Sequence, residues 1–377
     1  MIIFIFVKIS IALNPLATKI KICLVTVTLS DGGAERVAAE LSKYFYAQGY
    51  EVHHVVFSGK IVYEHAGNVL HLETLKDVKN SLWSRYKRFT VLASYLKKQK
   101  FNFIIDFRTK EFYWQEFILH RFVYKNYIQT IHSYHLSSYF PSSKIAAKLL
   151  YPKQTRFITV AHEIEKLLRQ DYTIDKVTTI YNPLHVENIF LKSQEPIENK
   201  GLFILAVGSM HENIKQFDVL IKAYAASVLP KNNVKLCLLG EGKLKTTFQE
   251  LVQKLGLTDK ISFEGHITNP FAYYAKALFT VSTSKYEGLP MSILESLACG
   301  TPVISYNYLS GPSEIIHNFE NGLLVKNQDT QALVQALNTL FEDKTLYLHC
   351  KSNAKLSVRK FDTTEIGKQW EHLFRKS

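Results

Sequence analysis

The sequence predicts an α/β protein with two doubly wound domains that face a cleft. Short, continuously apolar segments alternate with amphipathic ones, which is the pattern of buried parallel strands connected by helices. The pattern restarts after the polar stretch 192–200, so we expect two sheets rather than one. The chain has 377 residues, of which 47% are hydrophobic, and it can therefore bury large cores; this excludes wholesale disorder.

The first domain is expected over residues 19–185. A β-rich run at 19–28 leads through a glycine turn into a helix at 34–48, which carries apolar side chains on one face. The next strands are expected at 51–57, 103–107, 127–132, 156–160 and 178–181. Asn182-Pro183 then ends this half of the chain.

The second domain is expected over residues 186–360. Its strands are predicted at 203–207, 235–239, 261–263, 278–282 and 302–305, with amphipathic helices such as 217–226 and 291–298 between them. Residues 361–377 are predicted to form a final helix, in which Trp370 and Phe374 lie four positions apart on one apolar face.

The amino-terminal segment 1–18 begins with a strongly apolar run, residues 1–13. This run is shorter than the roughly 20 residues that a membrane-spanning helix needs. It also lacks the positive start and the small-residue cleavage site of a signal peptide. We expect a loose extension or an interfacial anchor.

The four cysteines, Cys23, Cys237, Cys299 and Cys350, are far apart in the sequence. They form no Cys-x-x-Cys pair, and the histidines show no metal-ligand spacing. This excludes a disulfide scaffold and a zinc ribbon, and it favours a reducing, cytoplasmic location.

The strongest chemical signal is the segment 285–295, which follows the predicted strand 278–282. Open α/β sheets bind ligands at such strand ends. Gly288 permits a close turn, and Pro290 suits the first turn of a helix whose free N–H groups can bind phosphate or hydroxyl oxygens. Glu287 and Glu295 can then address two parts of one extended ligand. The alternative is a capped helix with two solvated glutamates.

Other motifs surround this segment in a characteristic order. They are Val207-Gly208-Ser209, Lys215-Gln216-Phe217-Asp218, Leu239-Gly240-Glu241-Gly242, Phe263-Glu264-Gly265-His266, Ala298-Cys299-Gly300-Thr301-Pro302 and Gly311-Pro312-Ser313-Glu314. In this order the set strongly resembles the retaining family 4 glycosyltransferases of GT-B fold, which have two Rossmann-like domains. The match is dense over 200–330. It is thinner in the first half, through residues 30–36 and 180–183.

The resemblance implies a role for each matching residue. Glu287 matches the glutamate beside the transferred sugar, Glu295 the one that binds the ribose of the nucleotide sugar, and Lys215 the lysine that neutralises the diphosphate. It also implies that the final helix, 361–377, crosses back to the first domain. Further donor contacts, mainly through the backbone, are implied at Gly33, His266, Ile267, Gly288, Leu289, Pro290 and Met291.

One departure from the family lies at Ser209, where the family usually has arginine after the glycine that ends the Val-Gly strand. A charge-assisted contact contributes about 1.5–3 kcal/mol, or about one to two decades in rate when it forms only in the transition state. Three explanations are open: Lys215 suffices by itself, another basic residue takes the place of the arginine, or the enzyme is slow.

His132 ends a predicted strand of the first domain, where relatives often carry a histidine that points into the cleft. The alternative is a polar residue whose hydrogen bonds are satisfied by loop backbone. His135, three positions on, is a second candidate for the same role. Asp106 and Arg108 follow another strand and could contact an acceptor, although a structural role is the stronger expectation.

No Asp-x-Asp motif follows a predicted strand, so no metal ion is expected on the diphosphate. The helix start at 290–291 and Lys215 would stabilise the developing phosphate charge instead. The resemblance implies retention of anomeric configuration. A front-face mechanism needs no protein nucleophile, so Glu287 could position or stabilise the sugar. We expect no cofactor, and a UDP-sugar as the donor substrate.

The positive charge lies mainly in the first half: the net charge is +11 over 1–185 and +2 over 186–377. Residues 76–100 alone carry +7. Leu82, Tyr86, Phe89, Ala93 and Leu96 form an apolar helix face there, with Trp83 beside it. This combination suits an anionic membrane surface. The alternative is a core-facing stripe with solvated lysines. The stretch lacks a nucleic-acid-binding motif, so no nucleic acid partner is expected.

The leading hypothesis is a cytoplasmic glycosyltransferase, with a possible peripheral position on the inner face of the membrane. It would move a hexose-type sugar from a nucleotide sugar to a surface-glycan or lipid-linked acceptor. The alternatives are a nucleotide-sugar epimerase or hydrolase on the same scaffold, a nucleic-acid-binding protein suggested by the pI of 9.3, and a non-catalytic sugar-nucleotide binder suggested by Ser209.

Overall fold

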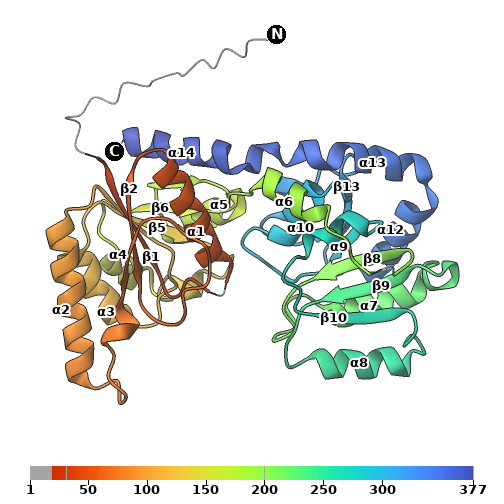
Figure 1. Ribbon diagram of the computed structural model, residues 1–377, viewed down its shortest axis with the longest axis horizontal. Coiled ribbons are helices and arrows are strands. Elements are labelled where there is room, and N and C mark those ends of the chain that lie inside the picture. Colours follow the sequence, from red (N-terminus) through yellow and green to blue (C-terminus); the bar gives the residue numbers. More distant parts are fainter. Residues whose placement is uncertain (1–18, 31, 199, 377) are drawn as a thin grey trace, which may run out of the picture.

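The computed structural model describes residues 19–30, 32–198 and 200–376, and it contains two parallel sheets (Figure 1). Over these residues, the first sheet has the strand order β3-β2-β1-β4-β5-β6-β7 and the second has the order β10-β9-β8-β11-β12-β13. Helices connect the strands, as parallel pairing requires. The predicted fold class, two Rossmann-like domains, is confirmed.

The strands of the first sheet lie close to their predicted positions. They are β1 (Lys21–Thr26), β2 (Glu51–Val56), β3 (Asn68–His71), β4 (Phe103–Asp106), β5 (Tyr127–Ile131), β6 (Arg156–Thr159) and β7 (Val177–Thr179). Strand β3 was not predicted, because it is a short edge strand with a polar residue at each end and no fully buried residue. Because none of its residues is fully buried, its sequence contains no long apolar run.

The strands of the second sheet are more continuously apolar. They are β8 (Phe203–Val207), β9 (Lys235–Leu239), β10 (Ile261–Gly265), β11 (Thr280–Ser282), β12 (Val303–Asn307) and β13 (Gly322–Lys326). The edge strand β13 was also missed as a strand. The bounds of β8 and β9 agree with the prediction, because both lie inside the sheet and are almost entirely buried.

Helices cover both faces of each sheet (Figure 1). Those of the first half are α1 (Gly33–Ala47), α2 (Leu82–Gln99), α3 (Tyr113–Ile118), α4 (Lys144–Leu150), α5 (His162–Tyr172) and α6 (Val186–Ser193). Those of the second half are α7 (Phe217–Ala226), α8 (Lys245–Lys254), α9 (Phe271–Lys276), α10 (Met291–Ala298), α11 (Pro312–Ile315), α12 (Thr330–Glu342), α13 (Lys344–Ser357) and α14 (Thr363–Arg375). A short π-helical segment, Leu119–Val123, follows α3.

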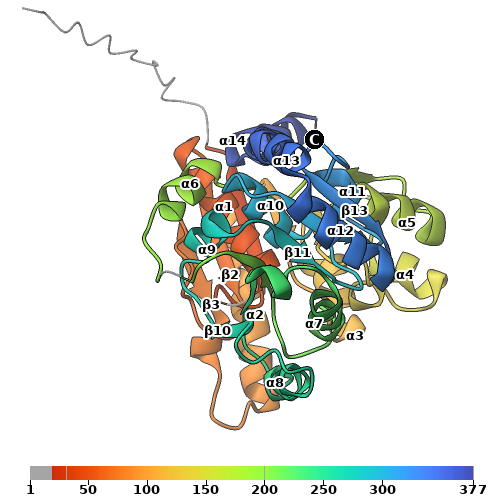
Figure 2. The same ribbon diagram turned by 90° about the vertical axis from the view of Figure 1, so that its right-hand side faces the viewer.

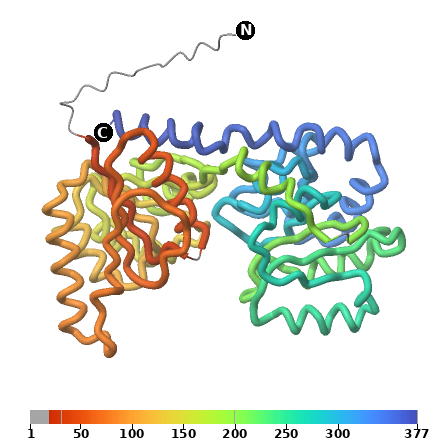
Figure 3. Tube along the Cα trace, in the orientation of Figure 1, coloured from red at the N-terminus to blue at the C-terminus, as the bar shows by residue number. Residues whose placement is uncertain are grey.

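Helices α13 and α14 run along one edge of the molecule and join the two domains (Figures 1 and 2). The Cα trace in Figure 3 shows the chain returning from the second sheet to the first through α14. There, Phe374 stacks on Phe103 of β4 with ring centroids 4.4 Å apart, and Trp370 meets Phe45 of α1 at 6.4 Å. Both α14 aromatics are buried. The apolar face of the last helix therefore extends the core of the first domain.

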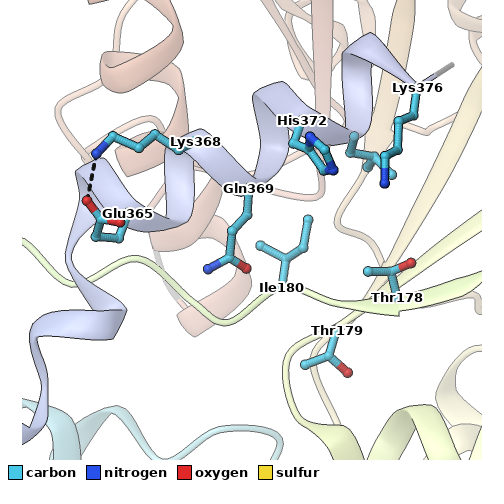
Figure 4. Close-up of a pocket in the computed structure, with 9 residues that line it drawn as sticks. Thr178, Thr179, Ile180, Glu365, Lys368, Gln369, His372 and Lys376 are labelled. Atoms are coloured by element: carbon cyan, nitrogen blue, oxygen red, sulfur yellow. Dashed lines mark hydrogen bonds and ion pairs between the residues drawn. The ribbon is translucent and has the colours of Figure 1, made fainter.

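A cavity of about 440 Å³ lies between β7 and α14 (Figure 4). Its lining includes Thr178 and Thr179 on one side and His372 and Lys376 on the other. Figure 4 shows Lys368 paired with Glu365 at its rim, at 2.7 Å. None of the predicted donor-site residues lines this cavity.

The apolar stripe of α2 is divided between core and surface. Leu92 and Leu96 are buried, whereas Leu82 is 82% exposed and Trp83 is 72% exposed. The alternative that the whole stripe faces the core is therefore wrong for its amino-terminal half. No helix in the described part of the chain is both long and apolar enough to cross a bilayer. The expectation for residues 1–18 falls outside the described residues and stays a prediction.

Candidate functional site

Glu287 and Lys215 form an ion pair, although 72 positions separate them in the sequence. Lys215 follows β8 and Glu287 follows β11, so both stand at the carboxyl edge of the second sheet. The Nζ atom of Lys215 lies 2.8 Å from Oε1 of Glu287. Ser284 Oγ donates to the same oxygen at 2.6 Å, and the Tyr308 hydroxyl lies 3.3 Å from it. These donors hold the Glu287 carboxylate in one orientation.

The stem of Lys215 crosses the backbone at Gly208, the residue that follows β8. A Cβ atom at Gly208 would lie 2.7 Å from Cγ of Lys215, closer than side chains tolerate. Glycine at this position therefore leaves the space through which the lysine reaches Glu287. The neighbouring Ser209 is exposed, and its Oγ accepts the His211 N–H at 3.3 Å.

Glu295 is buried in the second turn of α10, and it contacts the other domain. The Nη1 atom of Arg36, from α1, lies 3.0 Å from Oε1 of Glu295, and the Tyr274 hydroxyl lies 3.4 Å from Oε2. Burial raises the pKa of Glu295, and the nearby Arg36 guanidinium opposes that rise. Arg36 thus supplies the cation that favours the ionised form of this carboxyl group.

At Gly288 the backbones of the two domains approach each other closely. A Cβ atom added there would lie 2.0 Å from the carbonyl oxygen of His132. Close by, the rings of His135 and Tyr286 meet edge to face with centroids 4.0 Å apart. The loop after β5 therefore lies directly on the loop between β11 and α10.

The His132 ring is held inside the first domain. Its Nε2 lies 3.0 Å from Oγ1 of Thr130, and its buried Nδ1 has no hydrogen-bond partner among the described residues. Burial lowers the pKa of His132 to about 3, so the ring is neutral at physiological pH. The ring bonds to a side chain rather than to loop backbone, which was the alternative considered for it. A role toward a bound sugar stays a prediction.

The other predicted donor contacts lie around these groups. Gly33 is the first residue of α1, and a Cβ there would meet no described atom within 4 Å, so the space in front of it is open. His266 is exposed and Ile267 half-buried just after β10. Leu289 and Pro290 are buried at the start of α10. The sulfur of the half-buried Met291 accepts a hydrogen bond from Asn182 Nδ2 at 3.7 Å.

Sequence reasoning missed several partners that complete this arrangement. Arg36 stands three positions after Gly33, and this spacing could have drawn attention to it. Ser284, Tyr308 and Tyr274 carried no sequence signal, because only the fold brings them to the two glutamates. Glu314 on α11 was noted only as part of a motif. Its carboxylate accepts the His162 N–H at 2.9 Å and the Tyr181 hydroxyl at 2.9 Å, so it connects the two domains.

Asp106 and Arg108 belong to a buried ion network in the first domain and are not positioned to contact an acceptor. Arg108 donates to Asp106 at 2.7 Å and to Glu116 at 3.1 Å, and Lys110 donates to Asp106 at 2.7 Å. Asp106, Glu116 and His120 have the composition of a metal site. Two cations already neutralise the two carboxylates, however, so these residues fit an ion network better than a metal.

Comparisons with known proteins identify the family to which this chain is similar. The family model for glycosyl transferases group 1 matches residues 188–357, and the model for Glycosyltransferase Family 4 matches residues 31–188. The chain is 32% identical over 365 residues to the N-acetylgalactosamine-N,N'-diacetylbacillosaminyl-diphospho-undecaprenol 4-alpha-N-acetylgalactosaminyltransferase of Campylobacter jejuni, which covers 90% of this chain and 95% of the relative.

Two further similarities extend this result. A second Campylobacter jejuni protein, an alpha-1,4-N-acetyl-D-galactosaminyltransferase named for a diNAcBac-PP-undecaprenol substrate, is 29% identical over 94% of this chain and 98% of its own length. Among solved structures, Anabaena HepE in complex with UDP has a TM-score of 0.72 at 17% identity, covering 96% of this chain and all of that chain. At 17% identity, the similarity to HepE concerns the fold alone.

Proposed function

Because this chain belongs to the family 4 glycosyltransferases of GT-B fold, we propose that it transfers a hexose-type sugar from a UDP-sugar to a lipid-linked glycan, with retention of anomeric configuration. The observation that carries the proposal is the placement of the Lys215–Glu287 pair and of Glu295 at the edge of the second sheet that meets the first domain. Relatives that bear undecaprenol in their names support the choice of acceptor.

Each group at this edge has a chemical task in the proposed reaction. The buried Glu295 carboxylate would accept the ribose hydroxyl groups, and the first N–H groups of α10 would donate to phosphate oxygens, since they have no partner within the helix. Lys215 would neutralise charge that develops on the leaving diphosphate. Glu287, held by Lys215 and Ser284, would position the sugar rather than attack it.

The leaving group could be stabilised without a divalent ion. Lys215 is half-buried, with 23% of its side chain exposed, so a phosphate beside it would be shielded from water and the interaction strengthened. We therefore expect transfer to survive removal of divalent cations. His132 would place its backbone carbonyl, and not a charged ring, near the sugar, since its ring is neutral.

A transfer assay tests the proposed activity. Purified protein would be incubated with UDP-N-acetylgalactosamine, UDP-N-acetylglucosamine or UDP-glucose and an undecaprenyl-diphosphate-linked oligosaccharide, with EDTA throughout. We expect one donor to lengthen the acceptor by one sugar in an α-linkage, as read by mass spectrometry and NMR. Donor consumption without acceptor lengthening would instead favour the hydrolase or epimerase alternative. Absence of any donor consumption by folded protein would refute the proposal.

We further propose that the first domain binds the anionic inner face of the membrane through α2. The exposed Trp83 and Leu82 lie on a helix that also carries exposed basic residues such as Arg85 and Lys87. Interfacial aromatic and cationic side chains together favour such a surface, at about 1 kcal/mol for each basic residue near it. Figure 1 shows α2 along the outer edge of its domain, where a flat surface can reach it.

Vesicle sedimentation tests the membrane contact. We expect wild-type protein to sediment with phosphatidylglycerol vesicles but not with phosphatidylcholine vesicles. Arg85→Gln combined with Lys87→Gln should weaken this binding. As a control, Lys231→Gln combined with Lys254→Gln removes the same charge from exposed positions of the second domain and should not. Equal weakening by both pairs would mean that net charge alone matters and would refute a specific role for α2.

A further inference from the structure

Lys215, the cation assigned to the donor diphosphate, carries little net charge together with its partner. Lys215 is already paired with the Glu287 carboxylate at 2.8 Å, so the two side chains are close to neutral together. Ser209, which stands where related enzymes usually carry arginine, adds no charge. A nucleoside diphosphate that leaves during transfer gains negative charge, and a second cation would stabilise it further.

Arg36, from the first domain, contacts the candidate donor site of the second domain. Its guanidinium reaches across the domain boundary to Oε1 of Glu295 at 3.0 Å, and 47% of its side chain is exposed. Side chains on a helix lean toward its amino terminus, and the amino terminus of α1 begins at Gly33, in front of which the space is open. With nearly half of its side chain exposed, Arg36 is accessible to solvent as well as bonded to Glu295.

The Glu295 contact cannot persist unchanged when a nucleotide binds. In the proposed function, ribose hydroxyl groups donate to the Glu295 carboxylate, whose other oxygen already faces the Tyr274 hydroxyl at 3.4 Å. Ribose hydroxyl groups would approach the same carboxylate oxygens that Arg36 contacts, and a guanidinium that shares Oε1 with them is held less firmly. A guanidinium displaced from Oε1 has the length and the fork of donors to hold phosphate oxygens instead.

We propose that Arg36 is a binding residue for the donor diphosphate and replaces the arginine that is missing at position 209. In the ligand-free protein Glu295 holds its guanidinium, and ribose binding releases it toward the diphosphate. The inference rests on the proposed function. It adds one residue from the first domain, so that formation of the complete site requires the two domains to stay together.

Calorimetric titrations with UDP and with uridine separate this role from a structural one. We expect Arg36→Met, which keeps most of the apolar stem, to weaken UDP binding about 10- to 100-fold. Uridine binding should weaken much less than UDP binding, because uridine lacks the diphosphate and loses only the support that Arg36 gives to the Glu295 carboxylate. Adding Ser209→Arg to Arg36→Met should restore most of the UDP affinity. Lys43→Met removes a cation from the same helix that pairs with Glu40, and it should change neither titration.

Several outcomes would overturn the inference. Equal weakening of UDP and uridine would mean that Arg36 acts only by holding Glu295, and unchanged UDP binding would mean that Arg36 has no part in the site. Arg36→Lys, which keeps the charge and tests whether loss of binding reflects misfolding, should retain more UDP affinity than Arg36→Met. If wild-type protein binds neither UDP nor GDP nor ADP, the proposed function itself fails, and this is seen before any variant is made.

Discussion

Replacing Gly288 with alanine should separate the two domains without unfolding either one. The added Cβ would lie 2.0 Å from the His132 carbonyl oxygen, whereas real Cβ atoms stay at least 3.0 Å from such atoms. The loops after β5 and β11 would therefore have to move apart by about 1 Å, and a misplacement of about 1 Å at a reacting centre can lower the rate about 100-fold. We expect a loss of kcat/KM of this order in the transfer assay.

A matched variant isolates the effect of domain approach. Gly322→Ala creates a similar clash, 2.1 Å from the Val303 carbonyl oxygen, but inside the second sheet. It should lower the melting temperature, because β12 and β13 cannot separate without loss of their pairing. Gly288→Ala should melt close to wild type, because the clash can be relieved by opening between domains. If Gly288→Ala kept kcat/KM within about twofold of wild type, the reasoning would be refuted.

Three further predictions follow from single side chains. Lys215→Ala should lower kcat about one to two decades by removing the charge beside Glu287, whereas Lys222→Ala, exposed on α7, should not; equal rates would exclude the role of Lys215. Trp370→Ala should cost about 3–5 kcal/mol in urea unfolding because the side chain is buried, against at most about 0.5 kcal/mol for the exposed Trp83→Ala, and similar losses would contradict the packing of α14. Burial lowers the pKa of His54 to about 4, so between pH 6.5 and 4 the unfolded chain binds a proton there that the folded chain does not. The free energy of unfolding should therefore fall as the pH is lowered from 6.5 to 4. The His54→Gln substitution should reduce this slope by about 1.4 kcal/mol per pH unit, and an unchanged slope would count against the role of His54.

The fold was largely predictable because its strands are buried on both faces. Strands such as β8 appear in the sequence as unbroken apolar runs, and the following glycine marks their end. The edge strand β3 escaped prediction because its half-solvated residues leave no such run. The stripe on α2 could not be assigned, since an apolar helix face has the same periodicity whether a core or a membrane covers it.

The candidate site was only partly predictable. Glu287, Glu295 and Lys215 are recognisable because they sit in motifs at strand ends, where a parallel sheet exposes its loops. Their partners were not recognisable. Ser284 precedes Glu287 by three residues and resembles any loop serine, and Tyr308 follows another strand altogether. Nothing local in the sequence distinguishes them from other polar residues.

The sequence by itself determined the two doubly wound domains, the family resemblance and the positions of the two glutamates, because apolar periodicity and short motifs are local properties of the chain. Only the tertiary structure decided which charges meet. It paired Lys215 with Glu287, brought Arg36 to Glu295 across the domain boundary, and placed Gly288 against the His132 backbone. It also buried Asp106 and Arg108 in an ion network instead of exposing them to a ligand. These contacts join residues far apart in sequence, and their geometry is set by how the two sheets pack and face each other.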